Sequence, residues 1–171
     1  GWPDDRHFIE AFVLFPLYKR GYAREVLETL ERSRGHKEQA DLQAAQIEHV
    51  MPQSLREEWI EALGEDAERL HADWLHRPGN LTLSAYNQEL GNQAFGVKRK
   101  RFATSNIVLT RELADHAQWD AGSIRARGEA LAREAAAIWI GPKEPHVAAE
   151  GQEVMPAASR QEVRMRFWTG L

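Results

Sequence analysis

Two short strand-like segments interrupt a sequence that otherwise has helical periodicity, and they limit the folds open to this chain. Residues 47–50 read Ile-Glu-His-Val and stop before Pro52, while residues 80–83 read Asn-Leu-Thr-Leu and follow the turn Arg77-Pro78-Gly79. Short runs with apolar, partly β-branched side chains next to such breakers favour strands. The sequence therefore predicts an α+β fold that is mainly helical.

Apolar residues recur at helical spacing on both sides of these segments. We expect helices that begin at the possible caps Asp4 or Asp5, around residues 26–30, from Ser54 to Leu63, from about 65 to 75, from Ser84 to Gly91, and from about 123 to 140. The helices over 54–63 and 65–75 would form an insertion between the two strands. Gly141-Pro142 should end the last helix. Residues 143–158 are polar and small, which predicts a linker, and residues 159–171 would be a tail or the truncated start of a further element.

The chain has 171 residues, no cysteine and a formal charge of −4. Without cysteine it can form no disulfide, no zinc ribbon and no thiol nucleophile, so a metal would need His, Asp, Glu or Asn ligands. Those ligands suit hard or borderline cations. No apolar run approaches the ~18 residues that span a bilayer, and we therefore expect a cytoplasmic protein without membrane partners.

The charge is divided unevenly along the chain. Acidic residues dominate residues 57–73, whereas residues 93–111 carry basic residues and no acidic ones. The basic residues of that stretch include the run Lys98-Arg99-Lys100-Arg101. Such a run can contact nucleic-acid phosphates even on an acidic protein, although an isolated charge run is also typical of a solvated helix face.

Glu48 and His49 are neighbours within the first apolar segment, where an unpartnered carboxylate or imidazole would be costly to bury. Adjacent strand residues point to opposite faces, so both can serve one metal site only through a twist or at the strand end. Asn80, Asn87 and Asn92 follow within a short span. A surface histidine, a solvated glutamate, and asparagines in caps and turns would explain each feature separately.

Taken together, these residues resemble the HNH nuclease domain at the end of GmrSD-type (type IV) restriction proteins. The same domain ends SspE-type antiphage proteins that respond to DNA phosphorothioation. The resemblance covers about residues 2–142 and is densest over 47–102. It rests on the segments Ile47-Glu48-His49-Val50-Met51-Pro52-Gln53 and Gly79-Asn80-Leu81-Thr82-Leu83, followed by Asn87, Leu90, Asn92, Phe95 and Lys98.

The resemblance implies a ββα-metal core with a helical insertion, flanked by N- and C-terminal helices within a domain over residues 1–142. It implies that His49 is the general base that takes a proton from the attacking water and that Asn80 orients it. Glu48 and Asn87 would be ligands of one Mg²⁺ or Mn²⁺ ion, with Asn92 as the alternative to Asn87. The sequence departs from other HNH domains in two ways. The gap between residues 49 and 80 is longer than in compact HNH motifs. The chain also lacks the cysteine zinc site that braces many HNH domains, so the flanking helices would take that role.

By the same resemblance the chain would be a metal-dependent DNA endonuclease or nickase of a bacterial restriction or antiphage protein. Residues Lys98, Arg99, Lys100 and Arg101 would contact DNA phosphates beside the active-site helix. An N-terminal nucleotide-hydrolysing and sensing module would be its partner in the full-length protein. Two alternatives from other classes are an HNH-fold DNA-binding module with a decayed active site and a helical protein-interaction domain.

Overall fold

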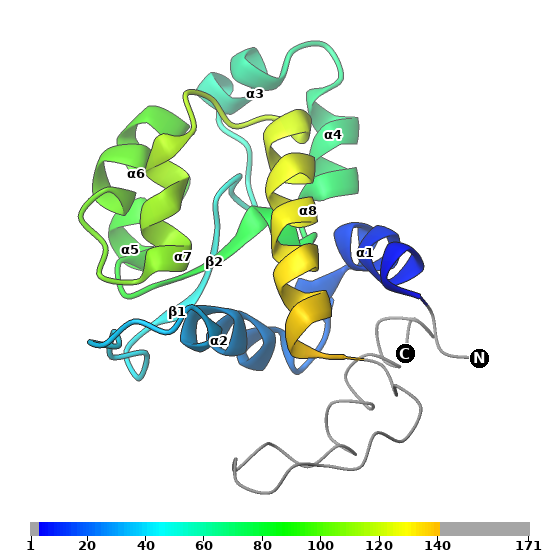
Figure 1. Cartoon of the computed structure of the whole chain (residues 1–171). Helices are drawn as coiled ribbons and strands as arrows, with labels where there is room; N and C mark the ends of the chain where they lie inside the picture. Colours follow the sequence, from blue (N-terminus) through cyan, green and yellow to red (C-terminus); the bar gives the residue numbers. More distant parts are fainter. Residues whose placement is uncertain (1–3, 141–171) are drawn as a thin grey trace, which may run out of the picture.

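The computed structural model describes residues 4–140 and places helices around one small antiparallel sheet (Figure 1). The mainly helical α+β fold is thereby confirmed. The predicted linker over 143–158 and the tail over 159–171 lie outside the described residues. The elements, with 3-10 helices labelled η, are α1 (Asp5–Leu14), η1 (Leu17–Lys19), α2 (Ala23–Ser33), β1 (Gln46–His49), α3 (Glu57–Leu63), α4 (Ala67–Trp74), η2 (Pro78–Asn80), β2 (Leu81–Ser84), α5 (Asn87–Leu90), α6 (Phe95–Phe102), α7 (Val108–Arg111), η3 (Glu112–Asp115) and α8 (Ala121–Ile138).

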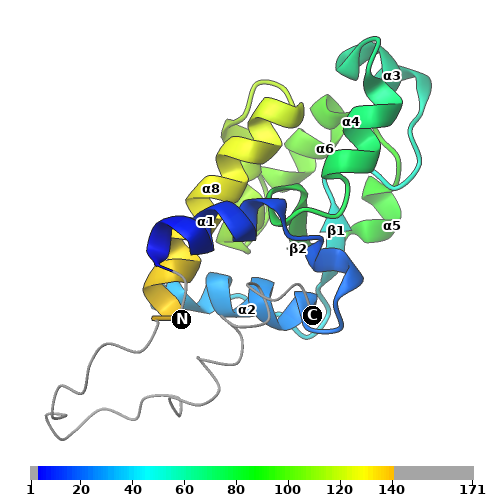
Figure 2. The same ribbon diagram turned by 90° about the vertical axis from the view of Figure 1, so that its right-hand side faces the viewer.

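The long helix α8 organises the molecule. In Figure 1, α1 lies on one side of α8, and the sheet with α5, α6 and α7 lies on the other. The insertion formed by α3 and α4 lies at the end of the molecule opposite α2, as both views show (Figure 2). Within residues 4–140, none of the helices has the length and apolar character that crossing a lipid bilayer requires.

The two predicted strands pair with each other in antiparallel register. Glu48 of β1 lies opposite Thr82 of β2, and His49 lies opposite Leu81. The second strand begins one residue later than expected, because Asn80 is the last residue of η2. The backbone N–H of Asn80 donates to the carbonyl of Arg77 at 3.0 Å, so the predicted turn continues as a 3-10 turn up to the strand.

Two clusters of buried apolar side chains form the core. The first joins α1, α2, β2, α7 and α8 through residues that include Phe8, Phe12, Leu27, Leu30, Leu83, Leu109 and Leu131. The second joins the end of β1 to α3, α6 and α8 through residues that include Val50, Trp59, Phe102, Trp119 and Ile124. The indole N–H of Trp59 also donates to the carbonyl of Gln93 at 2.9 Å, so the insertion is tied to the segment between α5 and α6.

Two predicted helix starts are wrong by a few residues. The first helix of the insertion begins at Glu57 rather than after Ser54, and its N-cap, Arg56, makes no side-chain capping bond. Ser84 ends β2 instead of capping the next helix, and its hydroxyl accepts the N–H of Tyr86 at 3.0 Å. Serine hydroxyls can make such local turns as well as cap helices, and sequence spacing does not separate the two.

The start of β2 is held directly against α8. A Cβ atom at Gly79 would lie 2.0 Å from the carbonyl oxygen of Ile124, so this approach requires glycine. The buried guanidinium of Arg127 on α8 donates to the carbonyls of Gly79, Leu81 and Leu109 at 2.9, 2.7 and 2.9 Å. These contacts fix the backbone that carries Asn80.

Candidate active site

A pocket with a volume of about 220 Å³ opens where the end of β1 faces α5. Four residues that the sequence singles out line it, namely Glu48, His49, Asn87 and Asn92, together with Ile47, Pro52, Gln53 and Gly91. His49 is the last residue of β1, where the alternation of side chains along the strand ends. Glu48 and His49 can therefore face the same pocket although they are adjacent in the chain.

Asn87, the first residue of α5, is held by β1. Its Nδ2 donates to the carbonyl of Ile47 at 2.9 Å, which sets the amide orientation. Its Oδ1 is buried and has no hydrogen-bond partner among the residues that the structure describes. A buried polar atom without a partner costs about 1–3 kcal/mol. A ligand in the pocket that binds this oxygen would remove that cost. Asn92 follows Gly91, which ends α5 at a φ of 40°.

Asn80 is fully buried and lies beside the pocket rather than in it. Its Oδ1 accepts the N–H of Met51 at 2.8 Å and the indole N–H of Trp119 at 3.0 Å. Its Nδ2 donates to the carbonyls of Met51 and Leu75 at 3.0 and 2.9 Å. Asn80 thus fastens the segment that follows His49, and the indole of Trp119 fixes the orientation of the Asn80 amide.

Glu48 is paired with Lys98, which the sequence groups with the basic run of residues 98–101. Nζ of Lys98 lies 2.7 Å from Oε1 of Glu48 and donates to the carbonyl of His49 at 2.8 Å. Burial raises the pKa of the Glu48 carboxyl and lowers that of the Lys98 ammonium, while the opposite charge of each partner counteracts the shift. The pair places a cation and an anion side by side under the pocket.

The prediction that Lys98 contacts a DNA phosphate is therefore wrong. Its side chain has no exposed surface. On α6 the residues Phe95, Lys98 and Phe102 are buried at helical spacing, whereas Arg99, Lys100 and Arg101 are exposed. The four basic residues are adjacent in the sequence, but the helix directs Lys98 toward the core and the other three toward solvent.

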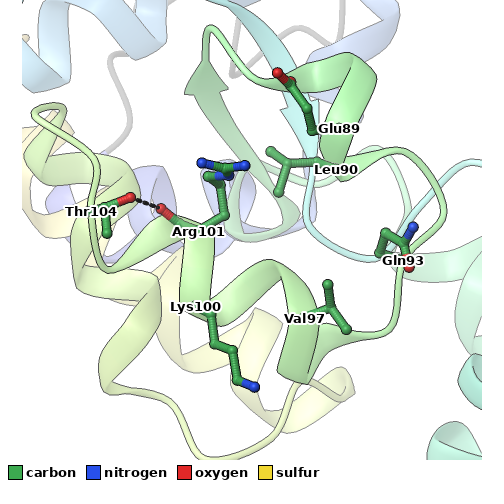
Figure 3. A pocket seen from close by; sticks show the side chains of 7 residues that line it. All are labelled: Glu89, Leu90, Gln93, Val97, Lys100, Arg101 and Thr104. Carbon is green, nitrogen blue, oxygen red and sulfur yellow. Dashed lines mark hydrogen bonds between the residues drawn. The ribbon is translucent and has the colours of Figure 1, made fainter.

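The three exposed cations remain on the outer face of α6. The guanidinium of Arg101 lies 5.0 Å from the ring centroid of Tyr86, and Nε of Arg99 donates to the carbonyl of Ala114 at 2.7 Å. Lys100 and Arg101 also line a second pocket between α5 and α6 (Figure 3). The other residues that line this pocket are Glu89, Leu90, Gln93, Val97 and Thr104.

His49 contacts a residue to which sequence spacing gave no role. Its Nε2 lies 3.3 Å from Nδ1 of His76, and the ring of Tyr18 packs against both imidazoles. Burial, assisted by the charges of His76, Lys98 and His71, lowers the pKa of His49 to about 3, so its ring is neutral at cellular pH. No periodicity links residues 49 and 76, because the α3–α4 insertion brings them together.

The oxygen donors of the pocket fit a hard divalent ion that completes its coordination with other ligands. Within residues 4–140 there is no cluster of three His, Asp or Glu side chains that could hold a metal by itself. The oxygen donors of the side chains that line the pocket include Oδ1 of Asn87 and the carboxylate of Glu48, and Asn92 adds a further amide. Mg²⁺ is commonly held by one or two such groups together with water and substrate phosphate, and Mn²⁺ accepts the same oxygen ligands.

Comparison with known proteins identifies a family for this chain. The C-terminal domain family of the GmrSD restriction endonucleases matches the chain over residues 2–134. That range contains both strands, the insertion, the pocket and α6. No curated protein and no solved structure matches the chain. The chain belongs to the family of C-terminal domains of GmrSD restriction endonucleases.

Proposed function

We propose that this chain is a metal-dependent DNA endonuclease or nickase domain of the HNH type in a bacterial restriction or antiphage defence protein. The observation that carries the proposal is Oδ1 of Asn87, which is buried without a partner among the described residues. It belongs to a residue of the pocket that Glu48 and His49 also line. Membership of a restriction endonuclease family supports DNA as the substrate.

His49 takes the proton from the attacking water in this proposal. Its imidazole is neutral because its pKa is lowered, so it has a lone pair ready to accept a proton. A DNA phosphate beside the ring would raise that pKa, since negative charge favours the imidazolium form. Asn80 supports this step from outside the pocket by holding the backbone of Met51, two residues beyond His49.

Glu48 and Asn87 are the residues that would hold Mg²⁺ or Mn²⁺. Because Nζ of Lys98 binds Oε1 of Glu48, we assign the other carboxylate oxygen to the cation. When bound, the ion supplies positive charge that polarises the scissile phosphate and stabilises the leaving oxygen. We assign Asn87 rather than Asn92 because the Asn87 Oδ1 atom is buried without a partner among the described residues, and its amide is already oriented by Ile47.

DNA would be held by the outer face of α6. Arg99, Lys100 and Arg101 are exposed there, next to the short helix α5 that contributes Asn87 to the pocket. The formal charge of −4 makes long-range attraction to DNA weak. The isolated domain should therefore cut slowly, and an N-terminal sensing and nucleotide-hydrolysing module would bring it to its target in the full-length protein.

A plasmid-nicking assay tests the proposal. The wild-type chain should nick supercoiled DNA with Mg²⁺ or Mn²⁺ and stop when EDTA is added. His49→Ala should lower the rate by about 10²- to 10⁴-fold, because it removes the general base. His36→Ala is the matched control, since His36 is an exposed histidine outside the pocket.

Three results would overturn the assignment. A folded His49→Ala protein that nicks at the wild-type rate would exclude the proposed base. A wild-type protein that never cuts but is retained on DNA at low salt would be the decayed DNA-binding module instead. A wild-type protein that neither cuts nor binds DNA would favour the helical protein-interaction domain.

A further inference from the structure

We infer that His76 is a positioning residue that fixes the tautomer and orientation of the His49 imidazole. This inference rests on the proposed function, in which His49 is the general base. His76 lies between α4 and η2, outside the two segments that line the pocket, residues 47–53 and 87–92.

The contact between the two imidazoles is a hydrogen bond whose direction depends on which ring nitrogen carries the proton. Nε2 of His49 and Nδ1 of His76 are 3.3 Å apart. Between two neutral imidazoles, one of these nitrogens must carry a proton and the other must offer its lone pair. The contact therefore couples the tautomer of His49 to that of His76.

The position of His49 in the pocket indicates which of its two ring nitrogens carries the proton. His49 lines the pocket, and its Nδ1 has no hydrogen-bond partner among the described residues, since its only side-chain bond uses Nε2. A base must offer a lone pair to the water that it activates. With the proton on Nε2 and donated to His76, the lone pair of His49 is at Nδ1, the nitrogen that remains available.

Tyr18 holds this arrangement in place. Its ring stacks on His76 with centroids 5.3 Å apart and an interplanar angle of 10°, and it meets the edge of His49 with centroids 4.3 Å apart. The backbone N–H of Tyr18 also donates to the carbonyl of His76 at 3.3 Å. The His76 ring is therefore fixed from a separate part of the chain, which is what an orienting partner needs.

The coupling also serves the chemical step. The proton of the attacking water moves to Nδ1 of His49, the hydroxide oxygen forms the bond to phosphorus, and the bond from phosphorus to the leaving 3′ oxygen breaks, with that oxygen taking a proton from solvent water. The ring then carries a positive charge and keeps its Nε2–H directed at Nδ1 of His76. A hydrogen bond donated by a charged group is stronger than a neutral one, so His76 stabilises His49 more after the proton transfer than before it.

Two variants separate the hydrogen bond from the ring contact. His76→Phe keeps an aromatic ring against Tyr18 but removes the acceptor. His76→Asn loses the ring but places an amide oxygen, an acceptor, near the position of Nδ1. The ring ¹⁵N chemical shifts of His49, recorded without metal and without DNA, report its tautomer in each protein. Nicking kinetics with Mg²⁺ or Mn²⁺ provide a second readout.

We expect the Nε2–H tautomer in the wild type and in His76→Asn, and a mixture of tautomers in His76→Phe. His76→Phe should lower kcat by roughly 10- to 100-fold at nearly unchanged KM, as is typical when an outer partner of a functional imidazole is removed. His76→Asn should recover most of that loss. An Nδ1–H tautomer in the wild type, or an unchanged tautomer and kcat in His76→Phe, would overturn the inference. If the wild type does not cut DNA at all, the proposed function fails, while the ¹⁵N shifts still decide the role of His76.

Discussion

Nζ of Lys98 lies 2.7 Å from Oε1 of Glu48, and the two side chains are 0% and 7% exposed. The sequence groups Lys98 with three surface cations of α6. In the structure, Lys98 is instead the counterion of Glu48, the carboxylate proposed to hold the metal. A buried carboxylate without a partner is strongly destabilising, so Lys98 allows Glu48 to be placed beneath the pocket. A mutant that removes all four basic residues would therefore disturb this site as well as the proposed DNA surface.

Lys98→Met should lower the free energy of unfolding by about 3–5 kcal/mol, because it leaves the Glu48 carboxylate buried and unpaired. Urea unfolding at neutral pH measures this loss. Lys100→Met is the matched control on the exposed face of the same helix, and it should change stability by no more than about 0.5 kcal/mol. Equal stability of the two variants would contradict the buried pair.

Asn87→Ala should weaken Mn²⁺ binding by roughly tenfold or more, since even outer partners of a metal ligand contribute 10- to 100-fold. Isothermal calorimetry of the DNA-free protein measures the affinity. Asn92 lines the same pocket, so Asn92→Ala serves as the control. Its affinity for Mn²⁺ should stay close to that of the wild type. A loss confined to Asn92→Ala would show that the ligand is the other asparagine.

Replacing Arg99, Lys100 and Arg101 together by Ala should reduce DNA affinity equally across sequences. The slope of log affinity against log salt should become shallower by about 0.9 for each phosphate contact that is lost. Fluorescence anisotropy at several salt concentrations measures both quantities.

The control for this experiment removes the same amount of charge elsewhere. Arg6, Arg69 and Arg133 are exposed on α1, α4 and α8, and their replacement by Ala also lowers the net charge by three. This variant should keep the wild-type salt slope. Identical lines for the wild type and the α6 variant would place the DNA path elsewhere.

Asp120→Ala should lower the free energy of unfolding by about 1 kcal/mol at neutral pH, because the Asp120 side chain caps α8 by accepting the N–H of Ser123. That bond lowers the pKa of the Asp120 carboxyl below 3.8. A carboxyl with a lowered folded-state pKa stabilises the protein above its unfolded-state pKa and loses this effect as the pH falls through the folded value.

Urea unfolding at several pH values between neutral and about pH 2 tests this dependence. The difference between wild type and Asp120→Ala should shrink as the pH falls below about 4, provided that the protein remains folded. Asp120→Asn retains a capping oxygen and should lose less stability at neutral pH. A pH-independent difference between wild type and Asp120→Ala would contradict the role of the ionised cap.

Local patterns located both strands and most of the helices of this fold, but they predicted neither α6 nor α7. The segments around Ile47 and Leu83 pair as strands, Asp4 caps α1 and Gly91 ends α5, as their sequence neighbourhoods predict. These features depend on residues within a few positions of one another, so the sequence contains the information directly. The starts at Ser54 and Ser84 were wrong because a serine hydroxyl has more than one local partner available.

The sequence by itself, through its resemblance to a known family, indicated that Glu48, His49 and Asn87 belong to one site, and the three residues line one pocket. Only the tertiary structure decided that Lys98 turns inward to Glu48 and that His76 meets His49. The direction of Lys98 follows from which face of α6 packs against the core, and the contact of His76 follows from how the α3–α4 insertion folds back. Such contacts join residues far apart in the chain, and they are set by the packing of whole elements, which no local spacing records.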